Sequence, residues 1–401
     1  MGASSTDELL KSNSSQKERY SKHVHDNVHG NIYLDPVFWL CNSLTLKSFR
    51  GKLRDLKQLG LSHLVYPGAV HSRFEHSLGV YWLAGTAVQT LKDYQGLELD
   101  IDDIDIQTVK LAGLLHDVGH GPFSHMFERE FLPRVLSGSN WSHEDMSLKM
   151  IDYIVDQHYI DIDSGRLDRV KSAKEKQFLY DIVANGRNGI DVDKKTSFNT
   201  SFVHRFDYIV RDSRACDLTV YKLFSARADL HRTVYTHAKV KAIELMLVDA
   251  LLEANEHLGI SSSIQQPAEF WKLDDTIINA ILADPRPELK KARDIILRVR
   301  RRQLYQFCNE YSVPKAKQEH FKGINAQDIV CSQDYCSDVK FLIDKEERIS
   351  HLLPTFCQDM IVRVYAKEPH LVEAVSDAFE NFQMKTYGEK TQIHGLWNVD
   401  F

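Results

Sequence analysis

The chain has 401 residues, a length that predicts two or three domains at roughly 150 residues each. Apolar residues make up 43% of it and charged residues 26%, which excludes a mostly disordered chain, a collagen-like fibre and a disulfide-stabilised miniprotein. The 50 lysines and arginines against 56 aspartates and glutamates give a net charge of −6, which argues against a protein that coats DNA.

The first part of the chain has the pattern of a mainly helical domain, over residues 21–260. Residues 1–20 are polar and serine-rich, and we expect a disordered tail there. Apolar residues at helical spacing predict helices over 76–91 and 106–118, the second after an acidic stretch that suits a helix N-terminus. Ser142 begins another helix, with Asp145 in the capping position. The amphipathic run 234–254 is expected to be the longest helix of the chain.

The texture changes after residue 260, and the remainder is interpreted as a smaller α+β lobe over 261–401. We expect a loop at 261–270, helices at 275–283, 287–302 and 370–384, and strands at 304–313, 328–333, 339–343 and 360–366. The fold class is therefore mainly α with an α+β C-terminal lobe. The basic residues within 290–302 are interpreted as a solvated helix face, with a phosphate or nucleic-acid contact as the alternative.

The segment LLHDVGHGPFSHMFE, residues 114–128, carries the strongest chemical signal. His116 and Asp117 stand at the end of an apolar helix, where polar side chains are stable only if they are paired or bind a metal. A histidine nitrogen and a carboxylate oxygen together suit a divalent cation such as Zn, Mn, Fe or Mg. His76 in HSRFEH and Asp193 in GIDVDK are the candidates that would complete a four-ligand site.

The order of these motifs resembles that of the HD-domain metal phosphohydrolases. HSRFEH, HDVGHGPFSH, WSHE and GIDVDK, joined by FDYIVRD, LHRTVYTH and IVRVYAK, are most similar to deoxynucleoside triphosphate triphosphohydrolases of the sterile-alpha-motif-and-HD-domain type. The similarity covers about residues 21–400. Only some twenty polar residues precede it, so the sterile-alpha-motif domain itself is not expected in this sequence.

The resemblance implies a metal-dependent homo-oligomer that hydrolyses a deoxynucleoside triphosphate, dGTP being favoured, to deoxynucleoside and tripolyphosphate. It assigns the metal to His76, His116, Asp117 and Asp193, and the acid/base chemistry to His120, His143 and Glu128. It assigns substrate contacts to Gln58, Arg73, Lys194, Tyr208, Asp212, Arg227 and Tyr235. An activating nucleotide would contact Lys22, Arg54, Arg363 and Lys367.

The residue types agree with these assignments. Arginine and lysine suit the roughly four negative charges of a triphosphate, which supports Arg73 and Lys194. Departure of the nucleoside 5′-oxygen needs a proton, which imidazole can supply near neutral pH, and a carboxylate such as Glu128 would orient the ring. His125 is interpreted instead as a capping or packing residue near the site.

The sequence also departs from the family pattern. Residues 195–205 intervene between Lys194 and the FDY segment, which the family places almost directly after it. The segment ending at Leu218 continues straight into TVYKLF, where the family has several dozen further residues, and Thr236 replaces a usual glutamine. We therefore expect low activity and weak nucleotide-driven assembly.

Two alternatives remain open at this point. One is a catalytically weak regulatory or nucleic-acid-binding protein, with single-stranded nucleic acid as partner, that keeps the metal ligands. The other is a general HD phosphomonoesterase or cyclic-nucleotide phosphodiesterase, against which the tyrosine and Arg/Lys motifs count. No apolar run approaches the roughly 18 residues of a membrane span and no secretory signal is seen, so we expect no membrane partner and a nuclear or otherwise cytoplasmic location.

Overall fold

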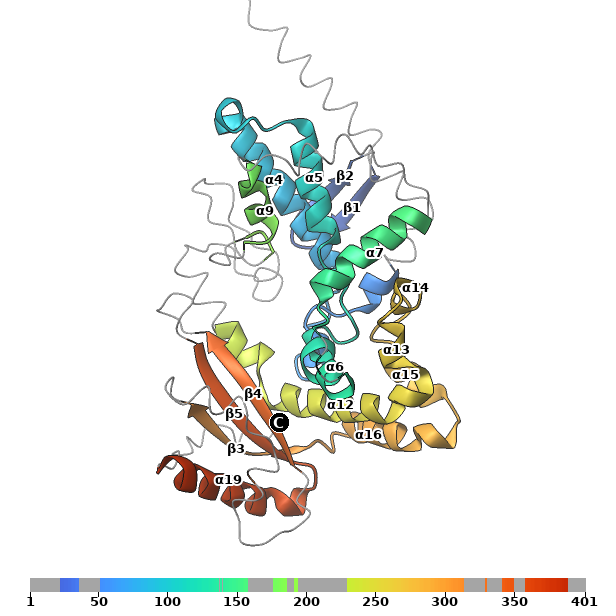
Figure 1. Ribbon diagram of the computed structural model, residues 1–401, viewed down its shortest axis with the longest axis vertical. Coiled ribbons are helices and arrows are strands. Elements are labelled where there is room, and N and C mark those ends of the chain that lie inside the picture. Colours follow the sequence, from blue (N-terminus) through green and yellow to red (C-terminus); the bar gives the residue numbers. More distant parts are fainter. Residues whose placement is uncertain are drawn as a thin grey trace, which may run out of the picture.

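The structure is a computed structural model, which describes residues 22–35, 51–136, 138, 140–157, 176–185, 191–193, 229–313, 329, 341–349 and 358–388. The expected tail at 1–20, the departures at 195–205 and after Leu218, and the predicted strand at 328–333 apart from Ile329 lie outside these residues. Within them, helices make up most of the chain up to residue 300, and a sheet with one covering helix forms a separate C-terminal layer (Figure 1).

The described chain begins with a β-hairpin that the sequence analysis did not predict. Strand β1 (Lys22–Asp26) pairs antiparallel with β2 (Gly30–Leu34). The Asp26 carboxylate accepts the backbone N–H groups of Val28 and His29, and Gly30 has a φ of 75°, so the turn is closed by residues suited to it. Ile32 and Leu34 are buried against the helical core, which anchors the hairpin beside the site.

Two long helices form the centre of the helical part. In α4 (Arg73–Leu99) Ser72 and Glu75 make a capping box, and in α5 (Asp103–Leu115) Asp102 and Asp105 do the same. Both helices match the predicted ones, and each begins three residues earlier than expected. The helices pack closely, because a Cβ placed on Gly113 would lie 3.1 Å from the carbonyl oxygen of Val80.

Shorter elements follow the HD motif. A π-helical turn, η2 (Phe127–Phe131), leads into α6 (Leu132–Val135) and then into α7 (His143–Gln157). The Asp145 backbone N–H donates to Ser142 Oγ at 3.1 Å, which confirms the predicted start of this helix. Helix α9 (Phe178–Val183) packs on α4 and α5.

The next helices correct two sequence predictions. After η4 (His231–Tyr235), helix α12 (Ala238–Leu258) has 21 residues and α4 has 27, so the run at 234–254 is not the longest helix. The expected loop at 261–270 is wrong, because it contains most of α13 (Ile260–Ser263) and all of α14 (Pro267–Phe270). Proline at the first position of α14 suits a helix start, where its missing N–H is not needed.

Helices α15 (Ile277–Ala283) and α16 (Lys290–Arg300), the latter after the 3₁₀ turn η5 (Pro287–Leu289), confirm the predictions at 275–283 and 287–302. Ile260, Phe270 and Ile296 are buried in the same core as α12. Residues 260–300 therefore pack into the same hydrophobic core as the helices that precede them.

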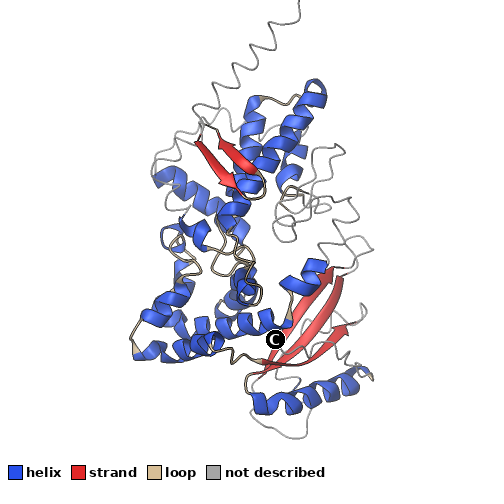
Figure 2. Cartoon of the chain, turned by 180° about the vertical axis from the view of Figure 1, so that it is seen from behind, coloured by secondary structure: helices blue, strands red, loops and turns tan. Residues whose placement is uncertain are grey.

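The C-terminal lobe is a three-stranded antiparallel sheet with one helix on it (Figure 2). Strand β5 (Gln358–Ala366) lies between β3 (Gln306–Val313) and β4 (Phe341–Ile349), matching the strands predicted at 304–313, 339–343 and 360–366. After the turn η7 (Pro369–Leu371), helix α19 (Val372–Tyr387) buries Phe379 against Val362 and Val364. The expected fold class, mainly α with an α+β C-terminal lobe, is confirmed.

Polar contacts fix this lobe to α12. The Asp249 carboxylate on α12 accepts a hydrogen bond from the Tyr305 hydroxyl at 2.7 Å and pairs with Lys367 Nζ at 2.5 Å. The Tyr365 hydroxyl donates to the carbonyl oxygen of Ala238 at 3.3 Å. None of the described helices is long and apolar enough to cross a membrane.

Candidate metal centre and catalytic site

The ends of two packed helices position three of the four predicted metal ligands. His76 lies in the first turn of α4, His116 caps the C-terminus of α5, and Asp117 follows it. Asp193 comes from the described segment 191–193, which is attached to α9 through the hydrogen bond from Val192 N to Ile182 O at 2.8 Å. Four residues separated by up to 117 positions therefore reach one region of the helical core.

Their donor atoms lie close together: those of His76, His116 and Asp117 are within 4.8 Å of one another, and Asp193 approaches both histidines. His76 Nε2 lies 3.0 Å from Asp193 Oδ1 and 3.7 Å from Asp117 Oδ2. His116 Nε2 lies 3.3 Å from Asp117 Oδ1 and 3.5 Å from Asp193 Oδ1. An ion with bonds of about 2.1 Å places neighbouring donor atoms about 3.0–3.4 Å apart, so these separations are close to those of a coordination shell.

The tautomer of His116 is set by the backbone. Its Nδ1 lies 2.8 Å from the carbonyl oxygen of Gly113, which can only accept, so Nδ1 carries the proton. Nε2 faces the Asp117 and Asp193 carboxylates; burial opposes protonation of the ring, but these carboxylates outweigh burial and raise the pKa of His116. The Nε2 atom is buried and has no well-formed hydrogen bond among the described residues. Fixing one ring nitrogen through a carbonyl is a common way to orient a metal-binding histidine.

The charges at this point also favour a cation. Burial opposes ionisation of Asp117. The electrostatic attraction of His116, Arg73 and His120 outweighs this effect, so the pKa of Asp117 lies well below its usual value. His116 and His76 likewise outweigh burial at Asp193 and lower its pKa. Two carboxylates held ionised beside two imidazoles, one with an orphaned nitrogen, fit a divalent metal ion, and these four residues would hold it.

Backbone contact couples this centre to α7. The N–H of Gly119 donates to Ser147 Oγ at 2.9 Å, and the same hydroxyl donates to the carbonyl oxygen of His116 at 2.7 Å. A Cβ on Gly119 would lie 2.2 Å from the backbone of His143 and Ser147, so only glycine allows this approach. Helix α7, which carries His143, is thus placed directly against the metal-binding turn.

The predicted acid/base residues form a second cluster beside the metal centre. The rings of His120 and His143 stack at 3.9 Å between centroids, 12° from parallel. His143 Nδ1 lies 2.8 Å from Glu128 Oε2, which can hold the ring proton and orient the imidazole. His120 Nε2 is 3.2 Å from Asp117 Oδ1, so it links the two clusters. Burial and the charge of Arg73 hold the pKa of His120 well below its usual value, so this ring is neutral.

The structure adds His125 to this cluster. Its Nδ1 lies 3.9 Å from Glu128 Oε2, and its ring meets those of His120 and His143 edge-on at 5.2 and 5.5 Å. Half of the side chain is exposed, in contrast to the buried His120. The sequence analysis treated His125 as a packing residue; its spacing of three from Glu128 was the signal that could have included it.

Gln58 and Arg73 lie beside this site. Gln58 follows a segment whose backbone pairs with the start of α4: Gln58 N donates to His71 O and Arg73 N to Leu56 O. The Gln58 side-chain oxygen is buried without a hydrogen-bond partner among the described residues, as expected of a group reserved for a ligand. Arg73 is buried, forms an ion pair with Asp117 through Nη1, and donates from Nε to Ser124 Oγ at 3.3 Å.

Tyr235 lies in η4, and its segment is connected to the same region because the Tyr66 hydroxyl donates to the carbonyl oxygen of Thr233 at 2.6 Å. Thr236, where the resemblance predicts glutamine, is buried and donates from its hydroxyl to the carbonyl oxygen of His231. The remaining predicted substrate contacts lie outside the described residues: Lys194, Tyr208, Asp212 and Arg227.

The four residues expected to bind an activating nucleotide are dispersed over two parts of this chain. Lys22 is described only through its backbone, in β1, and Arg54 is exposed with its guanidinium 4.6 Å from the Phe74 ring centroid. Arg363 is buried and donates to Glu310 Oε2 at 3.1 Å and to the carbonyl oxygen of Thr236 at 2.9 Å. Lys367 pairs with Asp249.

Comparison with known proteins agrees with this geometry. The HD domain family matches residues 73–181, which include His76, His116, Asp117 and His143. A protein of Dictyostelium discoideum named "Deoxynucleoside triphosphate triphosphohydrolase SAMHD1 homolog" is 35% identical over 90% of this chain and 80% of its own length. The chain belongs to the SAMHD1 family. The SAMHD1 proteins of Gallus gallus and Homo sapiens are 32% and 31% identical, over 92% and 86% of this chain and 76% and 70% of their own lengths.

Membership of the SAMHD1 family agrees with the candidate metal centre. The HD match ends at residue 181, whereas Asp193 lies beyond it and is placed by its contacts with His76 and His116. The candidate ligand set therefore extends past the HD match itself. A related protein of Acanthamoeba polyphaga mimivirus, "Putative HD domain-containing protein L394", is 29% identical over 74% of this chain.

Proposed function

We propose that this protein is a metal-dependent deoxynucleoside triphosphate triphosphohydrolase that releases deoxynucleoside and tripolyphosphate, with dGTP favoured. The observation that carries this proposal is the convergence of His76, His116, Asp117 and Asp193 beside the His120–His143–Glu128 cluster. Its SAMHD1 relatives are named deoxynucleoside triphosphate triphosphohydrolases.

The residues have distinct tasks in this proposal. His76, His116, Asp117 and Asp193 would hold the cation, which would supply an activated water and polarise the α-phosphoryl group. Water adds to the α-phosphorus while the bond to the nucleoside 5′-oxygen breaks, and that oxygen takes up a proton. Arg73, one residue past the α4 cap, is placed to neutralise phosphate charge, and Gln58 offers an unpartnered oxygen to a sugar hydroxyl.

The proton donor belongs to the histidine cluster. His143 is held by Glu128 at 2.8 Å, whose pKa lies below its usual value because His125 and His143 outweigh the effect of burial. The carboxylate therefore stays ionised and can stabilise a protonated imidazole at His143. His125 approaches the same carboxylate from its more exposed side, so both histidines are to be compared as donors.

The deciding experiment is a chromatographic assay of the purified chain with each of the four dNTPs, in Mn²⁺ and in Mg²⁺. We expect deoxynucleoside and tripolyphosphate in a 1:1 ratio, with dGTP turned over fastest. Release of a deoxynucleoside monophosphate with pyrophosphate, or of single phosphates, would replace the proposed reaction by another class of phosphohydrolase. The metal that restores activity after chelation identifies the ion among Zn, Mn, Fe and Mg.

A regulatory proposal accompanies this function. We infer that the chain forms homo-oligomers in which nucleotide-driven assembly is weak, and that its turnover is correspondingly low. This is supported by Arg363 and Lys367, which are already engaged by Glu310 and Asp249. Sedimentation with and without dGTP should show little change; a full shift to tetramer with fast dGTP hydrolysis would contradict it. Nuclear localisation is also proposed, to be checked by imaging the tagged protein in cells.

A further inference from the structure

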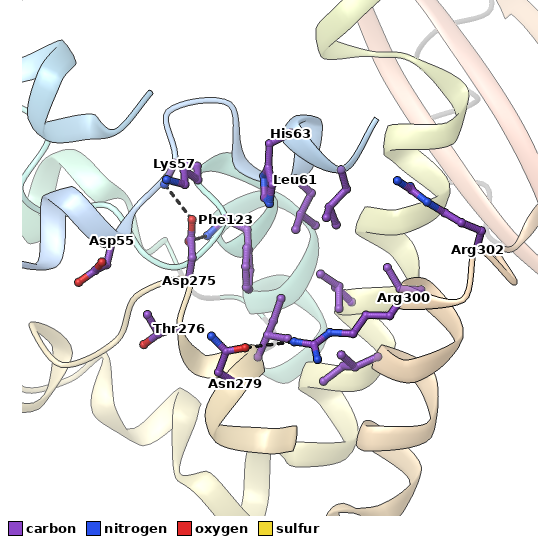
Figure 3. Close-up of a pocket in the computed structure, with 15 residues that line it drawn as sticks. Asp55, Lys57, Leu61, His63, Phe123, Asp275, Thr276, Asn279, Arg300 and Arg302 are labelled. Carbon is purple, nitrogen blue, oxygen red and sulfur yellow. Dashed lines mark hydrogen bonds between the residues drawn. The ribbon is translucent and has the colours of Figure 1, made fainter. Parts of the chain in front are cut away.

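One half-buried carboxylate connects two loops that are distant in sequence. Asp275, just before α15, accepts the backbone N–H of Lys57 at 2.8 Å through Oδ2 and that of Phe123 at 2.6 Å through Oδ1 (Figure 3). Lys57 precedes Gln58, and Phe123 stands three residues after His120. The carboxylate therefore joins the segment with the predicted sugar contact to the turn inside the HD motif.

That turn has a backbone conformation that needs support. Phe123 and Ser124 have consecutive φ angles of 58° and 59°, in the left-handed region that residues with side chains rarely adopt. Such a conformation persists only where surrounding contacts fix it. Asp275 supplies one contact, and Ser124 Oγ, which donates to the carbonyl oxygen of Lys57 at 2.8 Å, supplies another.

The Phe123–Ser124 turn also orients Arg73. Its Nε donates to Ser124 Oγ at 3.3 Å, while Nη1 pairs with Asp117. A shift of Ser124 would therefore move the arginine that faces the metal centre, and a shift of Lys57 would move Gln58. We propose that Asp275 is a positioning residue, whose carboxylate keeps the Gln58 segment and the Phe123–Ser124 turn in register so that Arg73 and Gln58 address the same substrate. The proposal rests on the function proposed above.

The charge of this carboxylate is unfavourable to the fold. Burial raises the pKa of Asp275 to about 7, although the N–H groups of Lys57 and Phe123 and the charge of Arg73 act in the opposite direction; Asp274 adds to the increase. Asp275 also lines a cavity of about 460 Å³, together with the ionisable side chains of Asp55, Lys57, His63, Arg300 and Arg302. The ionised form accepts both N–H groups fully, whereas a protonated carboxyl carries a hydroxyl that competes with one of them.

The sign of the pH effect follows from linkage. Between about pH 4 and about pH 7 the folded state holds a proton on Asp275 that the unfolded state has lost, so this group makes stability fall as pH rises through that window. Ionisation of Asp275, by contrast, strengthens the two hydrogen bonds that hold the Lys57 and Phe123 segments together. A residue with only a structural role would not move stability and turnover in opposite directions with pH.

The test compares Asp275→Asn with Asp274→Asn, which removes the same charge one residue away, where it caps Thr276 rather than bridging the loops. For Asp275→Asn we expect kcat/KM to fall on the order of 10- to 100-fold at about pH 8, with the deficit shrinking toward about pH 6. The unfolding temperature of Asp275→Asn, measured relative to that of the wild type, should increase as pH rises. Amide hydrogen exchange should be faster in peptides that contain Lys57 and Phe123.

Unchanged kcat/KM and exchange in Asp275→Asn would overturn the proposal, as would an unfolding temperature lowered equally at every pH. Equal effects in Asp274→Asn would also overturn it, because they would assign the change to local charge. If the wild type hydrolyses no dNTP, the proposed function fails, while the exchange rates and the pH dependence of unfolding still decide whether Asp275 holds the two loops.

Discussion

Buried polar groups are arranged differently in the helical part and in the C-terminal lobe. In the lobe, donors meet acceptors: Arg363 donates to Glu310 and Asn309 donates to Ser376 Oγ at 3.2 Å. In the helical part, His76, His116 and Asp117 place possible ligand atoms within 4.8 Å of one another, an arrangement that a cation would stabilise. The comparison indicates that the first arrangement serves the fold and the second serves a ligand.

The largest effect should come from removing a buried ligand. We expect Asp117→Asn to abolish metal binding and reduce turnover to background, because the amide lacks the charge that attracts the cation. Asp249→Asn, which loosens the Lys367 and Tyr305 contacts of the lobe, is the matched control and should keep the metal. Metal content by plasma mass spectrometry measures both; equal metal in the two variants would contradict the ligand assignment.

A second substitution distinguishes a loss of proton transfer from a loss of metal binding. His143→Ala should lower kcat by on the order of 10²- to 10⁴-fold with the metal retained, because it removes a proton donor and not a ligand. His25→Ala, which changes a hairpin histidine bonded to Asn31, controls for loss of an imidazole. Metal loss from His143→Ala would move His143 into the ligand set, and a larger defect in His125→Ala would make that residue the donor.

A core substitution in the lobe should act on stability alone. Phe379 is fully buried between α19 and the sheet, and truncation to alanine typically lowers the free energy of unfolding by about 3–5 kcal/mol. We expect Phe379→Ala to unfold at lower denaturant concentration while binding the same amount of metal. Loss of metal in parallel would show that the two regions are not separable.

The smallest expected effect is at the cap of α5. Asp102→Ala removes the acceptor of the Asp105 N–H, a change that costs about 0.5–2 kcal/mol. His116 ends this helix, so metal affinity should fall slightly with stability. Asp103→Ala, in the same acidic stretch but outside the capping box, is the control and should lie near wild type in chemical denaturation.

The sequence predicted what local patterns encode. Helical periodicity and capping residues located α4, α5, α7 and α16, and the motif order placed His76, His116, Asp117 and Asp193 together. It missed the hairpin at 22–34, whose strands are short, and the helices inside 261–270, where serine and proline suggested a loop. It also missed Asp275, because its partners lie 218 and 152 residues away.

Gly119 has a consequence for how this site can vary. Because the backbone of α7 fills the space that a side chain at 119 would need, any substitution there must push His143 away from the metal-binding turn. Gly68, by contrast, has open space around its Cβ position. In a saturation library selected for turnover, position 119 should accept almost nothing but glycine and position 68 many residues. We therefore expect the metal ligands and the histidine cluster to tolerate few substitutions at their point of contact, and the surrounding loops to tolerate many.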